Sequence, residues 1–170
     1  MPELIFITGL PGSGKSTLTR KLAGRSEKSF LLPVDDIRQM VVSGYLTPES
    51  QSGFLAELNR QFMLEREAAS LLANHYLMAG YDVVVEDVCL PPGFLAHFER
   101  EFRTALSKMI LLNPSEAVIR ARLEARGDPH DETFLDALPA LYPLIQSQNW
   151  DGWQVIDTSD MTLDATLATI

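Results

Sequence analysis

The sequence predicts an α/β protein in which a mostly parallel sheet is covered by helices on both of its faces. Three observations lead to this fold class: short apolar runs alternate with helix-like segments, the connections between these runs must cross over, and the first run leads directly into a glycine-rich loop. The chain has no repeat or linker. We therefore expect residues 1–170 to form a single domain.

The first expected elements lie on either side of the glycine-rich loop. Residues 4–8 are an apolar, β-favouring run of the kind that is buried on both faces of a parallel sheet. Residues 15–23 are predicted to be a helix, because Leu18 and Leu22 share one face and Gly24 follows as a terminator.

A long helical region is expected between the second and third strands. Residues 30–34 are the second strand, and Pro33 favours a place near the edge of the sheet because proline lacks the N–H that a ladder needs. Residues 48–79 carry apolar side chains at three- and four-residue spacing, which predicts one or two helices that end at Gly80. Residues 81–87 then form the third strand.

The second half of the chain continues the alternation. Residues 91–106 are predicted to be a helix and residues 108–112 the fourth strand. Asn113 as a cap, with proline at the first helical position and Glu116 at the third, predicts a helix that ends at Arg126. The remaining expected elements are a helix at 133–148, a fifth strand at 153–157 and a short last helix.

The charge of the chain is negative overall but is distributed unevenly. The net charge of -9 argues against non-specific binding to nucleic acid or anionic lipid, which Lys and Arg hold by their phosphates. Residues 1–30 nevertheless carry five bases and two acids, whereas residues 131–170 carry seven acids and no base. The basic segments around Lys15 and Arg122 are what a local anion site would need, although such clusters are often only solvated helix faces.

The composition also indicates a cytoplasmic protein. The single cysteine, Cys89, cannot form an internal disulfide, which favours a reducing compartment. No apolar run reaches the roughly 18–20 residues that a membrane span needs, and the first residues lack the basic start of a signal peptide. We therefore expect no membrane partner.

A complete phosphate-binding motif lies between the first strand and the first helix. Residues 9–16 satisfy G-x-x-x-x-G-K-[ST], and a strand–loop–helix context is the one that this P-loop motif requires. Its glycines let successive backbone N–H groups point at a phosphate, and the helix N-terminus adds positive charge. Lys15 is expected to reach the β- and γ-phosphates, and the Ser16 hydroxyl to ligate Mg²⁺. The expected nucleotide-binding residues of the loop are Gly12, Ser13, Gly14, Lys15, Ser16 and Thr17.

Carboxylates follow two of the expected strands. Asp35 and Asp36 come after the second strand, and Glu86 and Asp87 end the third, so all four are expected at the edge where ligands of open α/β sheets bind. Asp35 could accept a proton from a substrate hydroxyl, and Glu86 or Asp87 could hold a magnesium-bound water or the acceptor. Asp36 also suits a plain helix N-terminus.

Two arginines on the helix that follows the fourth strand could complete the site. Arg122 and Arg126 are four residues apart and share one helix face, and Gly127 and Pro129 then break the helix. Guanidinium groups suit the charge that spreads over a transferred phosphoryl group. This segment is therefore a candidate lid over a nucleotide that Arg122 would help to bind. The alternative is a solvated helix face.

With these motifs the chain resembles the small P-loop kinases grouped around the polynucleotide 5′-hydroxyl kinase domain and chloramphenicol phosphotransferase. The resemblance implies a three-layer α/β/α P-loop fold with strand order 2-3-1-4-5. It implies that Asp35 is the general base, that Arg38 and Asp87 bind the acceptor, and that Arg126 stabilises the transferring phosphoryl group. Glu86 departs from the resemblance, because the polynucleotide kinases carry a small or uncharged residue there.

The leading hypothesis is therefore a kinase that uses ATP and Mg²⁺ to phosphorylate a hydroxyl of a small molecule. One alternative is a polynucleotide 5′-hydroxyl kinase, for which exposed aromatic residues would have to stack bases. The aromatic candidates are Tyr45, Phe54, Phe62, Phe94 and Phe98. A second alternative is a nucleotide-dependent ATPase or switch in which Glu86 orients water.

Overall fold

The structure is a computed structural model, and it describes residues 2–47, 55–88 and 106–170. The helix expected over residues 91–106 lies outside these ranges apart from Leu106, which begins a strand instead. In the described residues no helix is both long and apolar enough to cross a membrane.

The strands are β1 (Leu4–Thr8), β2 (Ser29–Pro33), β3 (Asp82–Glu86), β4 (Leu106–Leu112) and β5 (Gln154–Ile156). The helices are α1 (Lys15–Ala23), α2 (Val34–Gln39), α3 (Leu55–Met78), α5 (Glu116–Arg126), α6 (Asp131–Gln146) and α7 (Leu163–Leu167).

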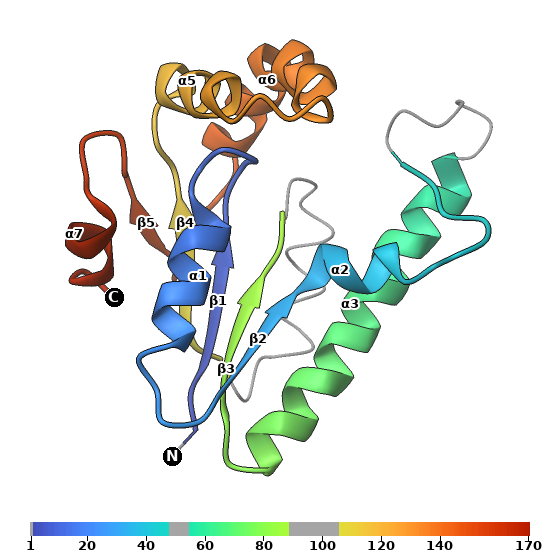
Figure 1. Cartoon of the computed structure of the whole chain (residues 1–170), viewed down its shortest axis with the longest axis vertical. Coiled ribbons are helices and arrows are strands. Elements are labelled where there is room, and N and C mark those ends of the chain that lie inside the picture. The colour runs from blue at the N-terminus through green and yellow to red at the C-terminus, as the bar shows by residue number, and fades with distance from the viewer. Residues whose placement is uncertain (1, 48–54, 89–105) are drawn as a thin grey trace.

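The five strands form one sheet in the order β2-β3-β1-β4-β5, and every pair of neighbours is parallel. Both the fold class and the strand order are confirmed. Pro33 ends β2 at the edge of the sheet, where a residue without an N–H interrupts no second ladder. Figure 1 shows β1 in the middle of the sheet, with the glycine-rich loop above it.

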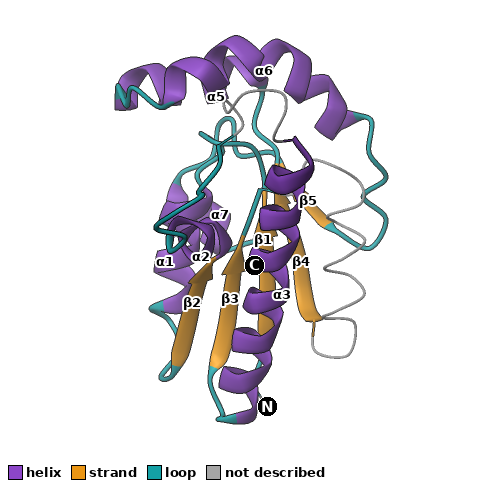
Figure 2. Ribbon diagram, turned by 90° about the vertical axis from the view of Figure 1, so that its right-hand side faces the viewer, coloured by secondary structure: helices purple, strands orange, loops and turns teal. Residues whose placement is uncertain are grey.

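The sheet is buried on both faces by two separate apolar clusters. Leu4 and Phe6 belong to the cluster on the side of α3 and α6, whereas Ile5 and Ile7 belong to the cluster on the side of α1 and α7. Successive side chains of a strand point to opposite faces, so a strand with helices on both sides must be apolar at every position. This explains why β1 is a continuous apolar run. Figure 2 shows α3 lying across one face of the sheet.

One helix begins later than the sequence predicted. A cap at Asn113 would start α5 at Pro114, but the first residue of the helix is Glu116 and its cap is Ser115. The Ser115 hydroxyl accepts a hydrogen bond of 3.4 Å from the Val118 amide. The Ser115 amide donates to the Ser159 hydroxyl at 2.8 Å, and this contact with the loop after β5 holds Ser115 outside the helix.

The parallel arrangement brings the carboxyl ends of the central strands together. Glu86 at the end of β3 is in register with Ile7 of β1 on one side and with Pro33 of β2 on the other. The segments that follow these three strands therefore start side by side. They are the P-loop, α2 and the residues after Glu86, and α5 lies above the P-loop (Figure 1).

Candidate active site

The P-loop is held in shape by its own backbone and by its lysine. The loop joins β1 to α1, and its last residue, Gly14, caps α1 with a φ of 98°. The Ser13 amide donates to the Leu10 carbonyl at 3.0 Å, and the Lys15 ammonium donates to the same oxygen at 3.2 Å. Lys15 is only 7% exposed and lines a cleft beside the P-loop, so its charge lies at the cleft and not in open solvent.

Two glycines of the loop are required by close contacts. A Cβ at Gly9 would lie 2.5 Å from the Leu112 carbonyl oxygen, and one at Gly12 would lie 2.9 Å from Leu123 Cγ. Both residues also have φ values that L side chains rarely adopt, +151° and +81°. The loop therefore packs directly against β4 and α5. This contact fixes where Arg122, the neighbour of Leu123, meets the loop.

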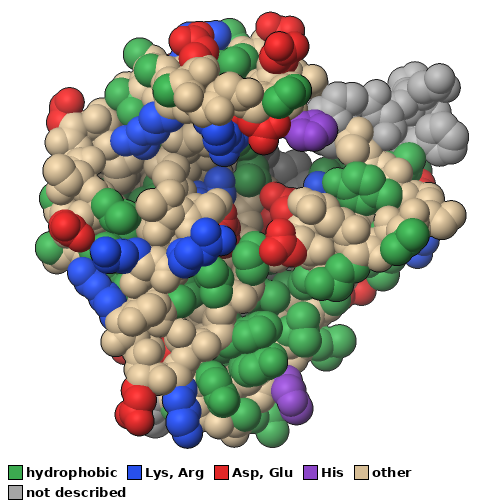
Figure 3. All heavy atoms as spheres, viewed as in Figure 1, with side chains coloured by type: hydrophobic (Ala, Val, Ile, Leu, Met, Phe, Trp, Pro, Cys, Tyr) green, Lys and Arg blue, Asp and Glu red, His purple; other side chains and the backbone are tan. Residues whose placement is uncertain are grey.

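A cleft of about 510 Å³ opens above the carboxyl ends of the strands. Its basic lining residues come from the P-loop, α1 and α5, and its acidic ones come from α2 and from the end of β3. In Figure 3 the cleft faces the viewer, with Lys and Arg side chains gathered on its left and Asp and Glu side chains on its right. The charged lining residues are Lys15, Arg20, Arg122 and Arg126 on the basic side, and Asp35, Asp36, Glu86 and Asp87 on the acidic side.

Glu86 contacts the P-loop helix directly. Its carboxylate accepts a hydrogen bond of 2.5 Å from the Ser16 hydroxyl and another of 2.8 Å from the Thr19 hydroxyl. Ser16 is the second residue of α1, and Thr19 lies about one turn further along. The two bonds fix the orientation of the carboxylate beside the residue that the motif assigns to Mg²⁺. Thr19 was not among the predicted site residues.

Arg122 and Arg126 lie on the cleft side of α5, as their spacing predicted. Arg122 donates to the Ser13 carbonyl at 3.1 Å and to the Thr158 carbonyl at 3.0 Å, so it joins the P-loop to the loop after β5. Arg126 donates through Nε to Asp131 at 2.7 Å. Hydrogen bonding to Asp131 raises the pKa of Arg126, which is half exposed and lines the cleft. Gly127 ends α5 with a φ of 64° and lets α6 begin a few residues later.

Asp35 and Asp36 occupy the first turn of α2 and line the acidic side of the cleft. Negative side chains are favourable there because a helix N-terminus carries partial positive charge. The Asp35 side chain is 49% exposed and lies 3.5 Å from an Nη of Arg38. The carboxylate therefore has one side toward the cleft and an arginine behind it.

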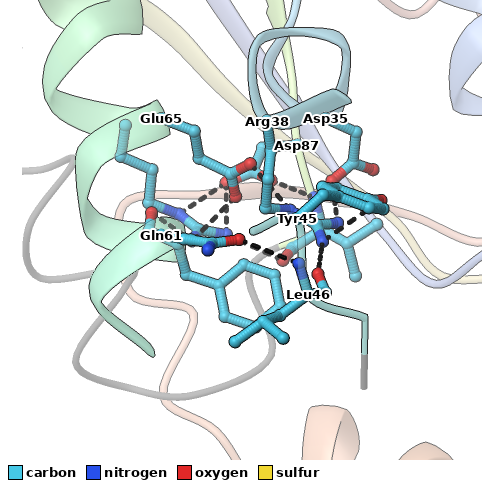
Figure 4. Close-up of polar contacts among 10 residues, drawn as sticks. Asp35, Arg38, Tyr45, Leu46, Gln61, Glu65 and Asp87 are labelled. Carbon is cyan, nitrogen blue, oxygen red and sulfur yellow. Dashed lines mark hydrogen bonds and ion pairs between the residues drawn. The ribbon is translucent and has the colours of Figure 1, made fainter. Parts of the chain in front are cut away.

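Arg38, expected to bind an acceptor, has a different set of contacts. It is 8% exposed and is not among the described residues that line the cleft. Its Nε donates to Glu65 at 3.0 Å, and one Nη donates to the Leu46 carbonyl at 3.0 Å and to the Tyr45 hydroxyl at 3.4 Å. Figure 4 shows Arg38 between Asp35 and Glu65, with Tyr45 beside it. Arg38 thus connects α2 to α3.

Asp87 lines the cleft but is 2% exposed and is bound by an arginine from α3. Arg66 donates to Asp87 Oδ2 through Nε at 2.9 Å, and an Nη of Arg66 lies 2.8 Å from the same oxygen. The other oxygen of Asp87 accepts from the Val88 amide at 2.7 Å. The Arg66–Asp87 pair therefore ties α3 to the end of β3.

Glu65 lies at the centre of this buried network. Its carboxylate contacts both Arg38 and Arg66, and oxygens of Asp35, Glu65 and Asp87 lie within 4.8 Å of one another. Burial, and secondarily the charge of Asp87, raises the pKa of Glu65 to about 8, although Arg66 and Arg38 oppose the shift. Among the described residues, the cations that contact these carboxyl groups are the guanidinium groups of Arg38 and Arg66.

The sequence did not single out Glu65 or Arg66. A charged residue on a long helix is usually solvated, and nothing in the local pattern distinguished these two from their exposed neighbours. Two of the aromatic candidates for base stacking also belong to this network. The Arg38 guanidinium lies 5.3 Å from the ring centre of Tyr45 and 4.7 Å from that of Phe62. Phe54, Phe94 and Phe98 lie outside the described residues.

Comparison with known proteins identifies the family. A model of an AAA domain, AAA_33, matches residues 4–139 and so covers most of the chain. The chain belongs to this family. An adenylate kinase from Thermococcus sibiricus is 28% identical over 144 residues, which span 78% of this chain and 71% of that kinase. The expected resemblance to small P-loop kinases is confirmed.

Solved structures of other proteins have the same fold. The tunicamycin resistance protein of Deinococcus radiodurans aligns with a TM-score of 0.71 at 19% identity, over 99% of this chain and 93% of that one. An unliganded sugar kinase from Janibacter aligns with a TM-score of 0.70 at 13% identity, over 99% of this chain and 92% of that one. At these identities the likeness concerns the fold alone.

Proposed function

We propose that this protein is an ATP- and Mg²⁺-dependent kinase that transfers the γ-phosphoryl group of ATP to a hydroxyl of a small molecule. Residues 1–170 form its single kinase domain in this proposal. The observation that carries the proposal is one cleft with the P-loop lysine and two lid arginines on one side and the half-exposed Asp35 carboxylate on the other. Such a pairing of cations with a base is what phosphoryl transfer to a hydroxyl requires.

The residues on the basic side of the cleft fit a nucleoside triphosphate and its metal ion. Lys15, Arg122 and Arg126 supply positive charge, and the loop from Gly12 to Thr17 supplies backbone donors at a helix N-terminus. Ser16 and Glu86 offer oxygen ligands, which Mg²⁺ prefers. When bound, the ion neutralises phosphate charge. Ser16 would hold it from the P-loop, and Glu86, which orients the Ser16 hydroxyl, would accept hydrogen bonds from water around the ion.

Asp35 acts as the general base on the other side. It takes the proton of the acceptor hydroxyl while the acceptor oxygen bonds to the γ-phosphorus. The bond from that phosphorus to the bridging oxygen breaks, and ADP leaves with the electron pair. Lys15 and Arg126 stabilise the charge on the transferring group. Asp87 lines the acceptor side and Arg38 lies behind Asp35, and each is held by a residue of α3, Asp87 by Arg66 and Arg38 by Glu65.

A small acceptor is favoured by the size and charge of the protein's surface. The cleft of about 510 Å³ is compact, and residues 131–170 carry no base that could extend a nucleic-acid track. A nucleotide acceptor is the second candidate, since the adenylate kinase of Thermococcus sibiricus is 28% identical to this chain. The phosphate of a nucleotide acceptor carries no hydroxyl proton that Asp35 would have to remove. Transfer that does not depend on Asp35 would therefore indicate a nucleotide acceptor rather than a hydroxyl acceptor.

The test is a transfer screen with γ-labelled ATP and Mg²⁺ over sugars, polyols, nucleosides, nucleotides and 5′-hydroxyl oligonucleotides. The proposal expects label on a hydroxyl of a small molecule, and no label with Lys15→Ala. Label on the phosphate of AMP would favour the second candidate. Hydrolysis of ATP that no acceptor stimulates, and that Asp35→Asn leaves unchanged, would instead identify an ATPase or switch.

A further inference from the structure

We propose that the acceptor of this kinase is uncharged or cationic, and that the acidic side of the cleft excludes anionic acceptors. This inference rests on the proposed function, and it narrows the class of substrate. The acceptor side is the part of the cleft opposite the P-loop. Apart from Glu86, which bonds to Ser16, its lining residues are Leu31, Pro33, Asp35, Asp36, Gln39, Asp87 and Val88.

The charged side chains that line the acceptor side are all carboxylates among the residues that the structure describes. Asp35 and Asp36 project from the first turn of α2, and Asp36 is exposed. Gln39 adds an uncharged donor and acceptor, while Leu31 and Pro33 add apolar surface from β2. An acceptor with a carboxylate or phosphate would bring like charges together at short range, in a cleft that screens them less than open water does.

Arg38 is the first cation near these carboxylates that could attract an anionic acceptor, but its side chain is already bound to other groups of the protein. Hydrogen bonds or ion pairs join it to Glu65, Asp35, the Leu46 carbonyl and the Tyr45 hydroxyl. The rings of Tyr45 and Phe62 cover its guanidinium. Reaching an anion in the cleft would require Arg38 to give up these hydrogen bonds and the cover of both rings, which would leave buried polar groups without partners.

Arg66 is the second such cation, and all of its N–H donors are engaged. Nε and one Nη contact Asp87, and that Nη also donates to the Val88 carbonyl at 3.3 Å. The other Nη donates to the Phe62 carbonyl at 2.9 Å and to Glu65 at 3.4 Å. Its side chain is 2% exposed. Arg66 therefore neutralises Asp87 and offers no donor to a ligand.

The basic residues of the cleft lie on the donor side. Lys15, Arg122 and Arg126 lie at the P-loop and on α5, where a triphosphate needs them, and Arg20 lies further along α1 on the same side. The cleft thus separates its charges, with cations around the phosphoryl donor and carboxylates around the acceptor. An uncharged polyol or an amino alcohol fits the second half, and a protonated amine gains from Asp36.

The experiment compares three acceptors that share one carbon chain. Sorbitol, 1-amino-1-deoxysorbitol and gluconate differ only at the first carbon, which is part of a hydroxymethyl group, an ammoniomethyl group or a carboxylate group, respectively. Adenosine and adenosine 3′-monophosphate form a second pair with the same 5′-hydroxyl. We expect kcat/KM with the uncharged or cationic member to exceed that with the anionic member by at least tenfold in each set that reacts.

A charge reversal at Asp36 ties the preference to this surface. Asp36→Lys should raise kcat/KM for the anionic member relative to the uncharged one by about tenfold, because Asp36 is exposed on the acceptor side. Asp164→Lys is the matched control, since it makes the same change of charge on α7, at the other end of the sheet from α2. Thermal melts of both variants check that they fold.

The possible outcomes distinguish failure of the inference about acceptor charge from failure of the proposed kinase function. Equal or faster transfer to gluconate or to adenosine 3′-monophosphate overturns the inference and leaves the kinase proposal standing. The same holds if Asp36→Lys and Asp164→Lys change the preference equally. Transfer to none of the five compounds, nor to any acceptor of the wider screen, overturns the proposed function and the inference with it.

Discussion

Ser16 of the P-loop and Glu86 of β3 are joined by a hydrogen bond of 2.5 Å between the serine hydroxyl and the glutamate carboxylate. The residues are 70 positions apart, and the parallel pairing of β1 with β3 brings them together. The second bond, from Thr19 at 2.8 Å, holds the same carboxylate. Glu86 is the residue at which this chain departs from the polynucleotide kinases. Its position beside Ser16 would allow it to assist a metal ion held by that serine.

Glu86→Gln should weaken the binding of Mg²⁺ while keeping the fold. The glutamine carbonyl can still accept from the Ser16 hydroxyl, but the negative charge is lost. Changes of this kind around metal ligands lower affinity by roughly 10- to 100-fold. A titration of nucleotide binding against Mg²⁺ measures the shift. Glu124→Gln, on an exposed position of α5, is the control and should leave the curve unchanged. An equal Mg²⁺ requirement in both variants would contradict the role of Glu86.

Gly12→Ala should destabilise the protein more than Gly80→Ala does. The two glycines have similar φ values, +81° and +85°, so both changes carry the backbone cost of about 1–2 kcal/mol. Only at Gly12 would the new methyl group meet a neighbour, Leu123 Cγ at 2.9 Å, which adds about 1–3 kcal/mol of overpacking. Urea unfolding of the two variants measures the difference. Equal losses would mean that the contact between P-loop and α5 is not tight in solution.

Asp87→Asn should destabilise the fold by about 3–5 kcal/mol, because it leaves the buried Arg66 guanidinium without its anion. Asp36→Asn, on an exposed lining residue, should change the free energy of unfolding by less than about 0.5 kcal/mol. Chemical denaturation gives both values. If Asp87→Asn folds as stably as the wild type but loses acceptor binding alone, Asp87 contacts the acceptor and its pair with Arg66 is dispensable.

The pKa of Glu65 makes stability depend on pH. Burial raises this pKa from 4.5 to about 8, so between these values the folded protein holds a proton that the unfolded chain has lost. The contribution of Glu65 to stability is therefore full below pH 4.5 and falls as the pH rises toward 8, by up to about 1.4 kcal/mol per pH unit.

Replacing Glu65 isolates this effect. Glu65→Gln keeps a hydrogen-bond acceptor for Arg38 and should abolish the loss of stability between pH 4.5 and about 8. Glu67 is exposed on the same helix, so Glu67→Gln should leave that loss of stability unchanged. Urea unfolding at a series of pH values compares the slopes. A wild-type slope that Glu65→Gln leaves unchanged would place the titration on another group.

The sequence alone was sufficient for the features that local patterns determine. The P-loop motif, the apolar run of β1 and the alternation of strands and helices are each set by neighbouring residues, and each has its expected place. The parallel sheet then follows from the crossover rule. The strand order came from the family resemblance, since no single run of residues specifies which strands are neighbours.

The contacts of Arg38 could not be predicted in the same way. Its partner Glu65 is 27 residues away on α3, and Arg66 and Asp87 are 21 residues apart. These pairs exist because α3 packs against α2 and β3, which depends on the whole fold. The start of α5 was misplaced for a related reason, since the Ser115 amide is held by Ser159 from the loop after β5.

In the proposed reaction, Asp35 takes the proton of an acceptor hydroxyl opposite the P-loop. The most direct measurement is the transfer of label from γ-labelled ATP to the acceptor by Asp35→Asn, alongside nucleotide binding by the same variant. If Asp35 is the general base, transfer should fall by about 10²- to 10⁴-fold while ATP binding stays at the wild-type level. Full transfer by Asp35→Asn would contradict this role.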